Sequence, residues 1–300
     1  MKRFKTFRRA VRRPFETAGY LFLQWTIPFI PRQIVVATAR FAGKMAMLIP
    51  TRERKIGLEN LDRVFGDTKS TAEKRHILKQ SFSTFALTML DIFWFTWRAE
   101  KRIPKYIEFP KEAHVLYEDK PLVLITAHFG NWELIGQAAA LQKSQFISIA
   151  ATVKNKQVDQ MLCNLRKKTG QIIIPQKGAM RTLIAHLRKG GKIAFVLDQH
   201  TGANEGGIPI NFLGKSMSVS SAPAAFAYRT GTEIILGFSL PQPGGKYKVL
   251  SLPPITPPPY NKENDTAQIA KELTQTIQNE ISAFIRTHPE FWLWAYRHWR

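Results

Sequence analysis

The sequence contains only one cysteine, Cys163, in 300 residues. A single thiol excludes an intramolecular disulfide and any zinc site built from two or more cysteines, so the expected compartment is a reducing one. Acidic residues are also scarce, 22 against 44 Lys and Arg, and the net charge is +22. Such an excess calls for an anionic partner: nucleic acid, a phosphate-bearing membrane, or an acidic protein or lipid substrate. Hydrophobic residues make up 44% of the chain, enough for a large core and too many for a disordered protein.

No uncharged stretch near the N-terminus is long enough for a straight membrane span. Residues 1–13 hold seven basic residues and no acid, and the uncharged, aromatic-rich stretch 17–31 has 15 residues, where a spanning helix needs about 20. A second apolar stretch, 34–49, carries only Arg40 and Lys44. We predict that residues 1–50 form a basic N-terminus with membrane-associating helices, an interfacial anchor or shallow re-entrant hairpin on anionic headgroups.

Two other interpretations of this segment stay open. A secretory signal peptide would use Ala37–Ala39 as its small-residue site, although Pro31 and Arg32 separate the apolar core from that site. The segment could also be a buried helix pair of a soluble protein.

Residues 51–114 have a helical pattern, and we predict a helical region packed on the body of the protein. Ser70 and Glu73 form a capping box, and apolar residues follow at helical spacing as far as Phe93. The aromatic cluster 91–97 at the end of this pattern is expected in the core.

From residue 115 onward, short β-branched runs alternate with helical patterns. This alternation predicts an α/β domain over 115–300 with a mostly parallel sheet flanked by helices. Its last helix has Ile or Leu at every fourth position from 269 to 285. The expected strands are Leu122–Thr126, Phe146–Val153, Gln171–Pro175, Ile193–Leu197, Thr232–Ser239 and Tyr247–Leu252.

The candidate catalytic pair follows the first long strand of this domain. His128 lies in the turn after the strand, and Glu133 lies in the first turn of the next helix. A histidine held by a carboxylate can act as general base for a hydroxyl, because the carboxylate fixes the tautomer and stabilises the imidazolium. The competing interpretation is structural: His128 caps the turn, and Glu133 favours the helix N-terminus.

No nucleophile motif accompanies this pair. A Gly-x-Ser-x-Gly sequence is absent, and Cys163 lies in a basic amphipathic stretch without an activating partner. The chemistry suggested is direct transfer to an acceptor hydroxyl without a covalent enzyme intermediate.

Other polar groups also follow strand ends, where ligands bind in open α/β sheets. Asp198 and Gln199 come directly after one strand, and Asn131 and Trp132 lie between the catalytic pair. We expect all four to bind substrate.

The densest positive charge in the body of the protein lies beside these strand ends. Residues 152–192 hold ten basic residues and one acid, a local net charge of +9. Such a stretch would steer a phosphorylated substrate or an acidic carrier protein. Arg166 is the expected direct phosphate contact, because its planar fork can bind bidentately.

The motif His128-Phe129-Gly130-Asn131-Trp132-Glu133 resembles that of the bacterial lipid A biosynthesis acyltransferases, the lauroyl and myristoyl transferases within the wider glycerolipid acyltransferase group. Further similar segments extend over residues 15–300. They are Arg54 with Asn60-Leu61 and Val64-Phe65; Asp159, Arg166 and Gly170; Asp198-Gln199 with Phe212-Leu213-Gly214; His288 to Trp294; and Arg297 to Arg300.

The resemblance implies transfer of a fatty acyl chain from acyl carrier protein, or acyl-CoA, to a hydroxyl of a lipid A precursor, a phosphorylated glycolipid. It implies His128 as general base, Glu133 as its orienting partner, and no metal or nucleotide cofactor. It also implies an enzyme on the cytoplasmic face of the bacterial inner membrane. The sequence departs from the family pattern at 151–155 and at Leu213, so another glycolipid or phospholipid acceptor stays open.

A protein without catalytic activity, binding membrane or nucleic acid, is the alternative from a different class. Nucleic-acid binding predicts aromatic residues within the basic stretch, but residues 152–192 contain no Phe, Tyr or Trp. We therefore expect no nucleic-acid partner.

Overall fold

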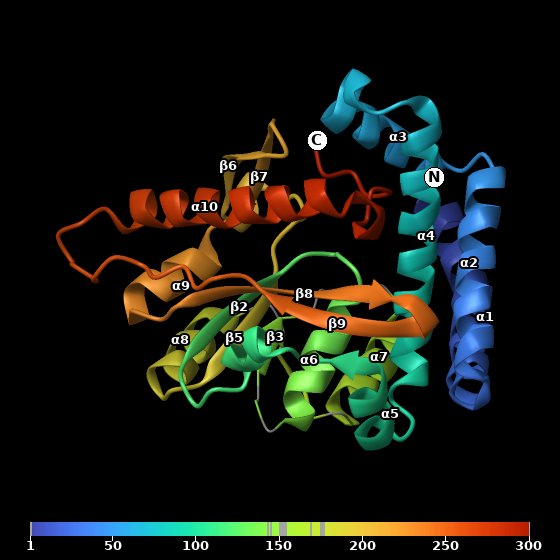
Figure 1. The fold of residues 1–300 in the computed structure, drawn as a ribbon, viewed down its shortest axis with the longest axis horizontal. Coiled ribbons are helices and arrows are strands. Elements are labelled where there is room, and N and C mark those ends of the chain that lie inside the picture. The colour runs from blue at the N-terminus through green and yellow to red at the C-terminus, as the bar shows by residue number, and fades with distance from the viewer. Residues whose placement is uncertain are drawn as a thin grey trace.

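The computed structural model describes residues 2–142, 144, 146–149, 155–168, 170–174 and 178–299, with side chains from residue 14 onward. Its centre is a seven-stranded sheet (Figure 1). In spatial order the strands are β1 (Ile107–Glu108), β9 (Lys246–Ser251), β8 (Ile234–Gln242), β2 (Leu122–Thr126), β5 (Lys192–Val196), β3 (Phe146–Ile149) and β4 (Ile172–Ile174).

The sheet is mostly parallel, as the sequence predicts. Strands β8, β2, β5, β3 and β4 are all paired in parallel, and only the β8–β9 pair is antiparallel. Each of the six expected strands overlaps an observed one, although the predicted ends 150–153 and Pro175 lie outside the described residues.

Helices cover both faces of the sheet. Val123 and Ile125 of β2 point to one face and share a core with Ile277 and Ile281 of the last helix. Leu122 and Leu124 point to the other face. The alternation follows from the strand period of two, and a central strand buried on both faces is therefore apolar throughout. The helices are α1 (Lys2–Thr26), α2 (Arg32–Leu48), α3 (Arg52–Phe65), α4 (Thr71–Trp94), α5 (Ala99–Tyr106), α6 (Trp132–Leu141), α7 (Lys156–Lys168), α8 (Ala179–Arg188), α9 (Ala222–Thr230) and α10 (Thr266–Thr287).

Helix α4 connects the N-terminal helices to the body. The predicted capping box is present, because the Ser70 hydroxyl accepts from the Glu73 N–H and the Glu73 carboxylate accepts from the Ser70 N–H. Helix α2 packs along α4, beside one end of the sheet (Figure 1). At Gly43 the two helices approach so closely that a Cβ would lie 2.0 Å from the Ser83 Oγ.

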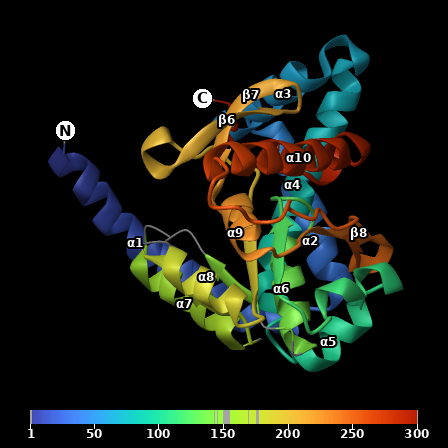
Figure 2. The same ribbon diagram turned by 90° about the vertical axis from the view of Figure 1, so that its left-hand side faces the viewer.

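The two N-terminal helices bury one side and expose another. Helix α2 buries Val35 and Ala39, but large apolar side chains stay exposed along both helices and the turn between them. No single helix in the described chain has the length and apolar composition of a membrane span; 32–48 and 52–68 meet these criteria only as a pair bent by 85°. The N-terminal part of α1 extends away from the body (Figure 2). The exposed set is Phe15, Leu21, Phe22, Trp25, Phe29, Ile34, Phe41, Leu48 and Ile49.

A two-stranded antiparallel ribbon, β6 (Gly207–Phe212) and β7 (Lys215–Ser220), was missing from the sequence prediction. Its inner side chains, Ile210, Phe212, Met217 and Val219, are buried. The alternating apolar pattern was visible in the sequence, but the surrounding glycines and polar residues favoured a loop.

Candidate active site

The candidate site is built at the carboxyl ends of two neighbouring parallel strands. Thr126 and Val196 are the last paired residues of β2 and β5, and His128 and Asp198 each lie two residues beyond the end of their strand. Equal extensions of paired parallel strands place these two side chains together. The His128 Nδ1 lies 2.7 Å from the Asp198 Oδ1.

Asp198 is fully buried and accepts three hydrogen bonds. Besides the His128 ring, the backbone N–H of His128 donates to Oδ2 at 2.9 Å, and the Trp292 Nε1–H donates to Oδ2 at 2.7 Å. Burial by itself raises the pKa of Asp198, but the charges of His128 and His298 and the hydrogen bonds from His128 and Trp292 together outweigh it and hold this pKa below its ordinary value. The group beside Nδ1 is therefore a carboxylate.

The His128 ring is oriented for base chemistry at its other nitrogen. A carboxylate at Nδ1 keeps the proton there and leaves Nε2 as an acceptor. Nε2 lies 3.3 Å from the Gln199 amide nitrogen, and 20% of the His128 side chain is exposed. The Trp132 ring packs edge-on against the imidazole, with centroids 4.9 Å apart.

Glu133 does not occupy the position that the sequence analysis assigned to it. Its carboxylate binds Arg166, whose Nε and Nη2 donate at 3.0 and 2.7 Å. Glu133 lies in the first turn of α6, which directs its side chain toward Arg166 of α7, whereas Asp198 lies just after β5, the strand paired with β2. The prediction of Glu133 as the orienting partner is therefore corrected: Asp198 holds the imidazole.

Arg166 also differs from its predicted role. Its fork is engaged bidentately by Glu133 rather than held open for a phosphate. Burial lowers the pKa of Arg166, but the Glu133 carboxylate more than compensates and raises it above its ordinary value. The nearby Tyr20 hydroxyl of α1 is buried without a hydrogen-bond partner among the described residues, and burial raises its pKa.

Two residues expected to bind substrate are structural in this geometry. Asp198 is enclosed by its three donors, and Asn131 is fully buried, with its Oδ1 capping α6 through the Leu134 N–H at 3.2 Å. Trp132 and Gln199, which touch the His128 ring, are partly exposed and can reach a substrate.

The C-terminal segment holds the backbone of the turn that carries His128. The Gly130 N–H donates to the Phe291 oxygen, and the Leu293 N–H donates to the His128 oxygen. Gly130 has φ +55, and a Cβ there would lie 1.8 Å from the Ser239 oxygen, so this position requires glycine. In the sequence, only the family resemblance indicates the segment 288–294. Its Trp292–Asp198 contact joins residues 94 positions apart, so no local sequence pattern predicts it.

No cluster of three or more His, Cys, Asp and Glu within the described residues is placed to hold a metal ion. Together, the fold and the contacts define an open α/β protein with a carboxylate-held histidine at the carboxyl end of a central strand.

Comparison with known proteins gives the family. The sequence pattern of the bacterial lipid A biosynthesis acyltransferases matches residues 1–300. The chain belongs to this family, and it is an acyltransferase with an acyl donor and a lipid acceptor. No curated protein matches the sequence. Among solved structures, the 1-acyl-sn-glycerophosphate (LPA) acyltransferase PlsC from Thermotoga maritima is similar at 14% identity and a TM-score of 0.35, over 84% of this chain and 98% of that one.

Proposed function

We propose that the protein transfers a fatty acyl chain from a thioester donor to a hydroxyl of a lipid A precursor, with His128 as general base. The observation that carries this proposal is the His128–Asp198 contact, because it makes Nε2 the basic nitrogen on the partly exposed side of the ring. In this mechanism Nε2 takes the proton of the acceptor hydroxyl as its oxygen attacks the thioester carbonyl. The tetrahedral intermediate then expels the thiolate, which receives that proton from the imidazolium, and an ester remains on the acceptor.

Incubation of the purified protein with acyl carrier protein or CoA thioesters and a phosphorylated, hydroxyacylated glycolipid tests this proposal. The expected product is heavier than the acceptor by one fatty acid less one water. His128→Ala should abolish its formation, and the exposed His76 offers a matched control, since His76→Ala should leave the rate unchanged. No product with either donor, or normal turnover by His128→Ala, would refute the proposed reaction.

We also propose that the exposed apolar side chains of α1, α2 and the turn between them dock on the cytoplasmic face of the bacterial inner membrane. Residues 1–50 would then be the membrane-associating region, with 51–114 packed on the catalytic body of 115–300. Phe22 and Trp25 are 66% and 69% exposed, and the helix that carries them begins with the basic run 2–13. Aromatic side chains with flanking cations are typical of interfacial helices.

Vesicle flotation tests this surface. Phe22→Ser with Trp25→Ser should weaken binding to anionic vesicles and make the remainder more sensitive to salt. Tyr260→Ser removes an exposed aromatic side chain (45% exposed) outside the N-terminal helices and should bind as wild type does. Equal binding by both variants would place the membrane surface elsewhere.

The donor we favour is an acidic carrier protein. Lys167 and Lys168 at the end of α7, and Arg188 and Lys189 at the end of α8, are exposed. Lys167→Glu with Lys168→Glu should raise KM for the carrier thioester and leave KM for the CoA thioester nearly unchanged, because CoA lacks the protein surface. An equal rise for both donors would contradict carrier docking on α7.

A further inference from the structure

The cap of α6 is tied to a buried group on α4. Besides capping α6 with its Oδ1, Asn131 donates from Nδ2 to the Asp91 Oδ2 at 3.0 Å. Asn131 is fully buried and Asp91 is 1% exposed. The same side-chain amide therefore fixes the start of α6 and its position relative to α4.

Asp91 is in turn held by the first residue of α2. Both terminal nitrogens of the Arg32 guanidinium donate to the Asp91 carboxylate, and its Nε and Nη2 donate to the Gly245 oxygen at 3.0 and 2.8 Å. The Tyr247 hydroxyl adds a further hydrogen bond to the Asp91 Oδ2 at 2.5 Å. A hydrogen-bonded network of side chains thus connects α2 through α4 to the cap of α6.

Stability alone does not account for this arrangement. Arg32 is 3% exposed and lies over the Trp94 and Phe95 rings, at 4.8 and 5.2 Å from their centroids. Removing both charges from water in such surroundings carries a large desolvation penalty, and apolar residues of similar volume often stabilise a fold as well or better. The ion pair does fix the orientation of Arg32 relative to Asp91, because a bidentate guanidinium–carboxylate pair has a single favourable geometry.

The α6 end of this hydrogen-bonded network carries groups of the candidate site. The first turn of α6 carries Trp132, which packs on the His128 ring, and Glu133, which holds Arg166. Gly130, one residue before the cap, accepts a hydrogen bond from the Thr88 hydroxyl of α4 at 2.9 Å. Helix α4 thus anchors the catalytic turn at two neighbouring residues.

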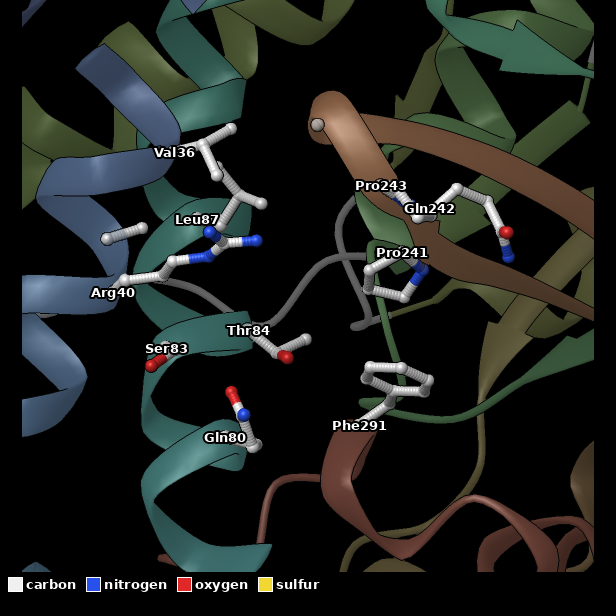
Figure 3. A pocket seen from close by; sticks show the side chains of 12 residues that line it. Val36, Arg40, Gln80, Ser83, Thr84, Leu87, Pro241, Gln242, Pro243 and Phe291 are labelled. Atoms are coloured by element: carbon white, nitrogen blue, oxygen red, sulfur yellow. The ribbon is translucent and has the colours of Figure 1, made fainter. Parts of the chain in front are cut away.

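The Arg32 side chain donates to Asp91 and to the Gly245 oxygen, and neither residue belongs to the His128–Asp198 pair. Gly245 lines a pocket between α2, α4 and the β8–β9 turn (Figure 3). Neither His128 nor Asp198 is among its lining residues. Arg32 thus bridges α2 to this turn, and its hydrogen-bonded connection to the His128 turn runs through Asp91 and Asn131.

We infer that Arg32, Asp91 and Asn131 are positioning residues, which hold the start of α6 and the His128 turn in the reactive geometry. The N-terminal helices are then part of the catalytic unit and not only a membrane anchor. This inference rests on the proposed function, with His128 as the base.

Asn131→Ser is the sharpest single variant, because Ser caps a helix about as well as Asn does but its side chain is one bond shorter and no longer reaches Asp91. A misplacement of about 1 Å can lower a rate about 100-fold, so kcat should fall by about that factor while KM for both substrates stays within about threefold.

Tyr247→Phe covers the case in which Asn131→Ser fails to fold, because it removes one donor to Asp91 and keeps the ring. Its kcat should fall about 3- to 10-fold with KM unchanged, the rate equivalent of one hydrogen bond. The matched control is Lys192→Met at the start of β5. Lys192 is also a buried cation, donating to the Leu116 oxygen and the Ser144 hydroxyl, and its loss should lower the melting temperature but leave kcat per folded molecule unchanged.

Wild-type kcat in folded Asn131→Ser or Tyr247→Phe would overturn the inference. The same holds if Lys192→Met lowers kcat as much as Asn131→Ser, because the effect would then follow stability alone. Failure of the proposed function would be recognised by a different result, because His128→Ala would then show normal turnover.

Discussion

Replacement of Asp198 by asparagine should disable the base without changing the shape of the site. The carboxylate accepts from three N–H groups: the His128 ring at Oδ1, and the His128 backbone and the Trp292 indole at Oδ2. An amide offers one oxygen and one NH₂ group. If its oxygen takes the place of Oδ2, the NH₂ group faces the His128 Nδ1, which must then accept, and the ring proton moves to Nε2.

The opposite amide orientation is less favourable. It would keep the bond to Nδ1 but point the NH₂ group at two buried donors, and each unmade hydrogen bond costs about 1–3 kcal/mol. The first orientation therefore prevails by about 2–6 kcal/mol, because it keeps all three hydrogen bonds whereas the other loses two. With the proton on Nε2, the ring cannot accept the proton of the acceptor hydroxyl.

The expected loss in kcat is about 10⁴-fold, the value found for the same substitution in a serine-protease triad. Acyl transfer followed by mass spectrometry under saturating substrates measures it, and Glu133→Gln is the control, because Glu133 contacts Arg166 and not His128. Asp198→Asn should lose far more rate than Glu133→Gln. A loss below about tenfold in Asp198→Asn, or a larger loss in Glu133→Gln, would refute the assignment of Asp198 and restore Glu133 as the orienting group.

Three further outcomes follow from the same contacts. Trp292→Phe keeps an aromatic ring but removes the donor to Asp198 and leaves space where the indole was buried. It should lower the free energy of unfolding by at least about 1–3 kcal/mol, measured by urea denaturation. An unchanged midpoint would show that the indole hydrogen bond does not stabilise the fold. Gly130→Ala should destabilise the fold by more than about 3 kcal/mol, since positive φ adds to the clash with Ser239, and wild-type melting would contradict the glycine requirement. The pKa of Asp198 is lowered in the folded state. The ionised carboxylate therefore contributes its full share of the folding stability above the unfolded pKa of about 3.9, and this stability is lost as the pH falls through the folded pKa. The stability difference between wild type and Asp198→Asn should therefore shrink below about pH 4, and a difference that grows with acid would contradict the lowered pKa.

Much of the fold is predictable because its signals are local. The Ser70 capping box, the apolar run 122–126 and the four-residue spacing of the last helix each specify an element without reference to the rest of the chain. The position of His128 follows as well, since a polar residue just after a buried parallel strand lies at the ligand-binding edge.

The partner of His128 depends instead on strand order. Glu133 is near in sequence, but Asp198 is near in space because β5 pairs with β2. The chain forms β3 and β4 before it returns to lie beside β2, and no local pattern encodes that return. The buried Arg32–Asp91–Asn131 network depends in the same way on three elements distant in sequence.

The central claim is that this chain adds an acyl chain to a lipid A precursor through His128. Mass spectrometry of lipid A from cells without the gene, complemented with wild type or with His128→Ala, tests it most directly. The account predicts that lipid A lacks one ester-linked acyl chain in the deletion strain, regains it with wild type, and still lacks it with His128→Ala. Identical lipid A in all three strains, or restoration by His128→Ala, would contradict it.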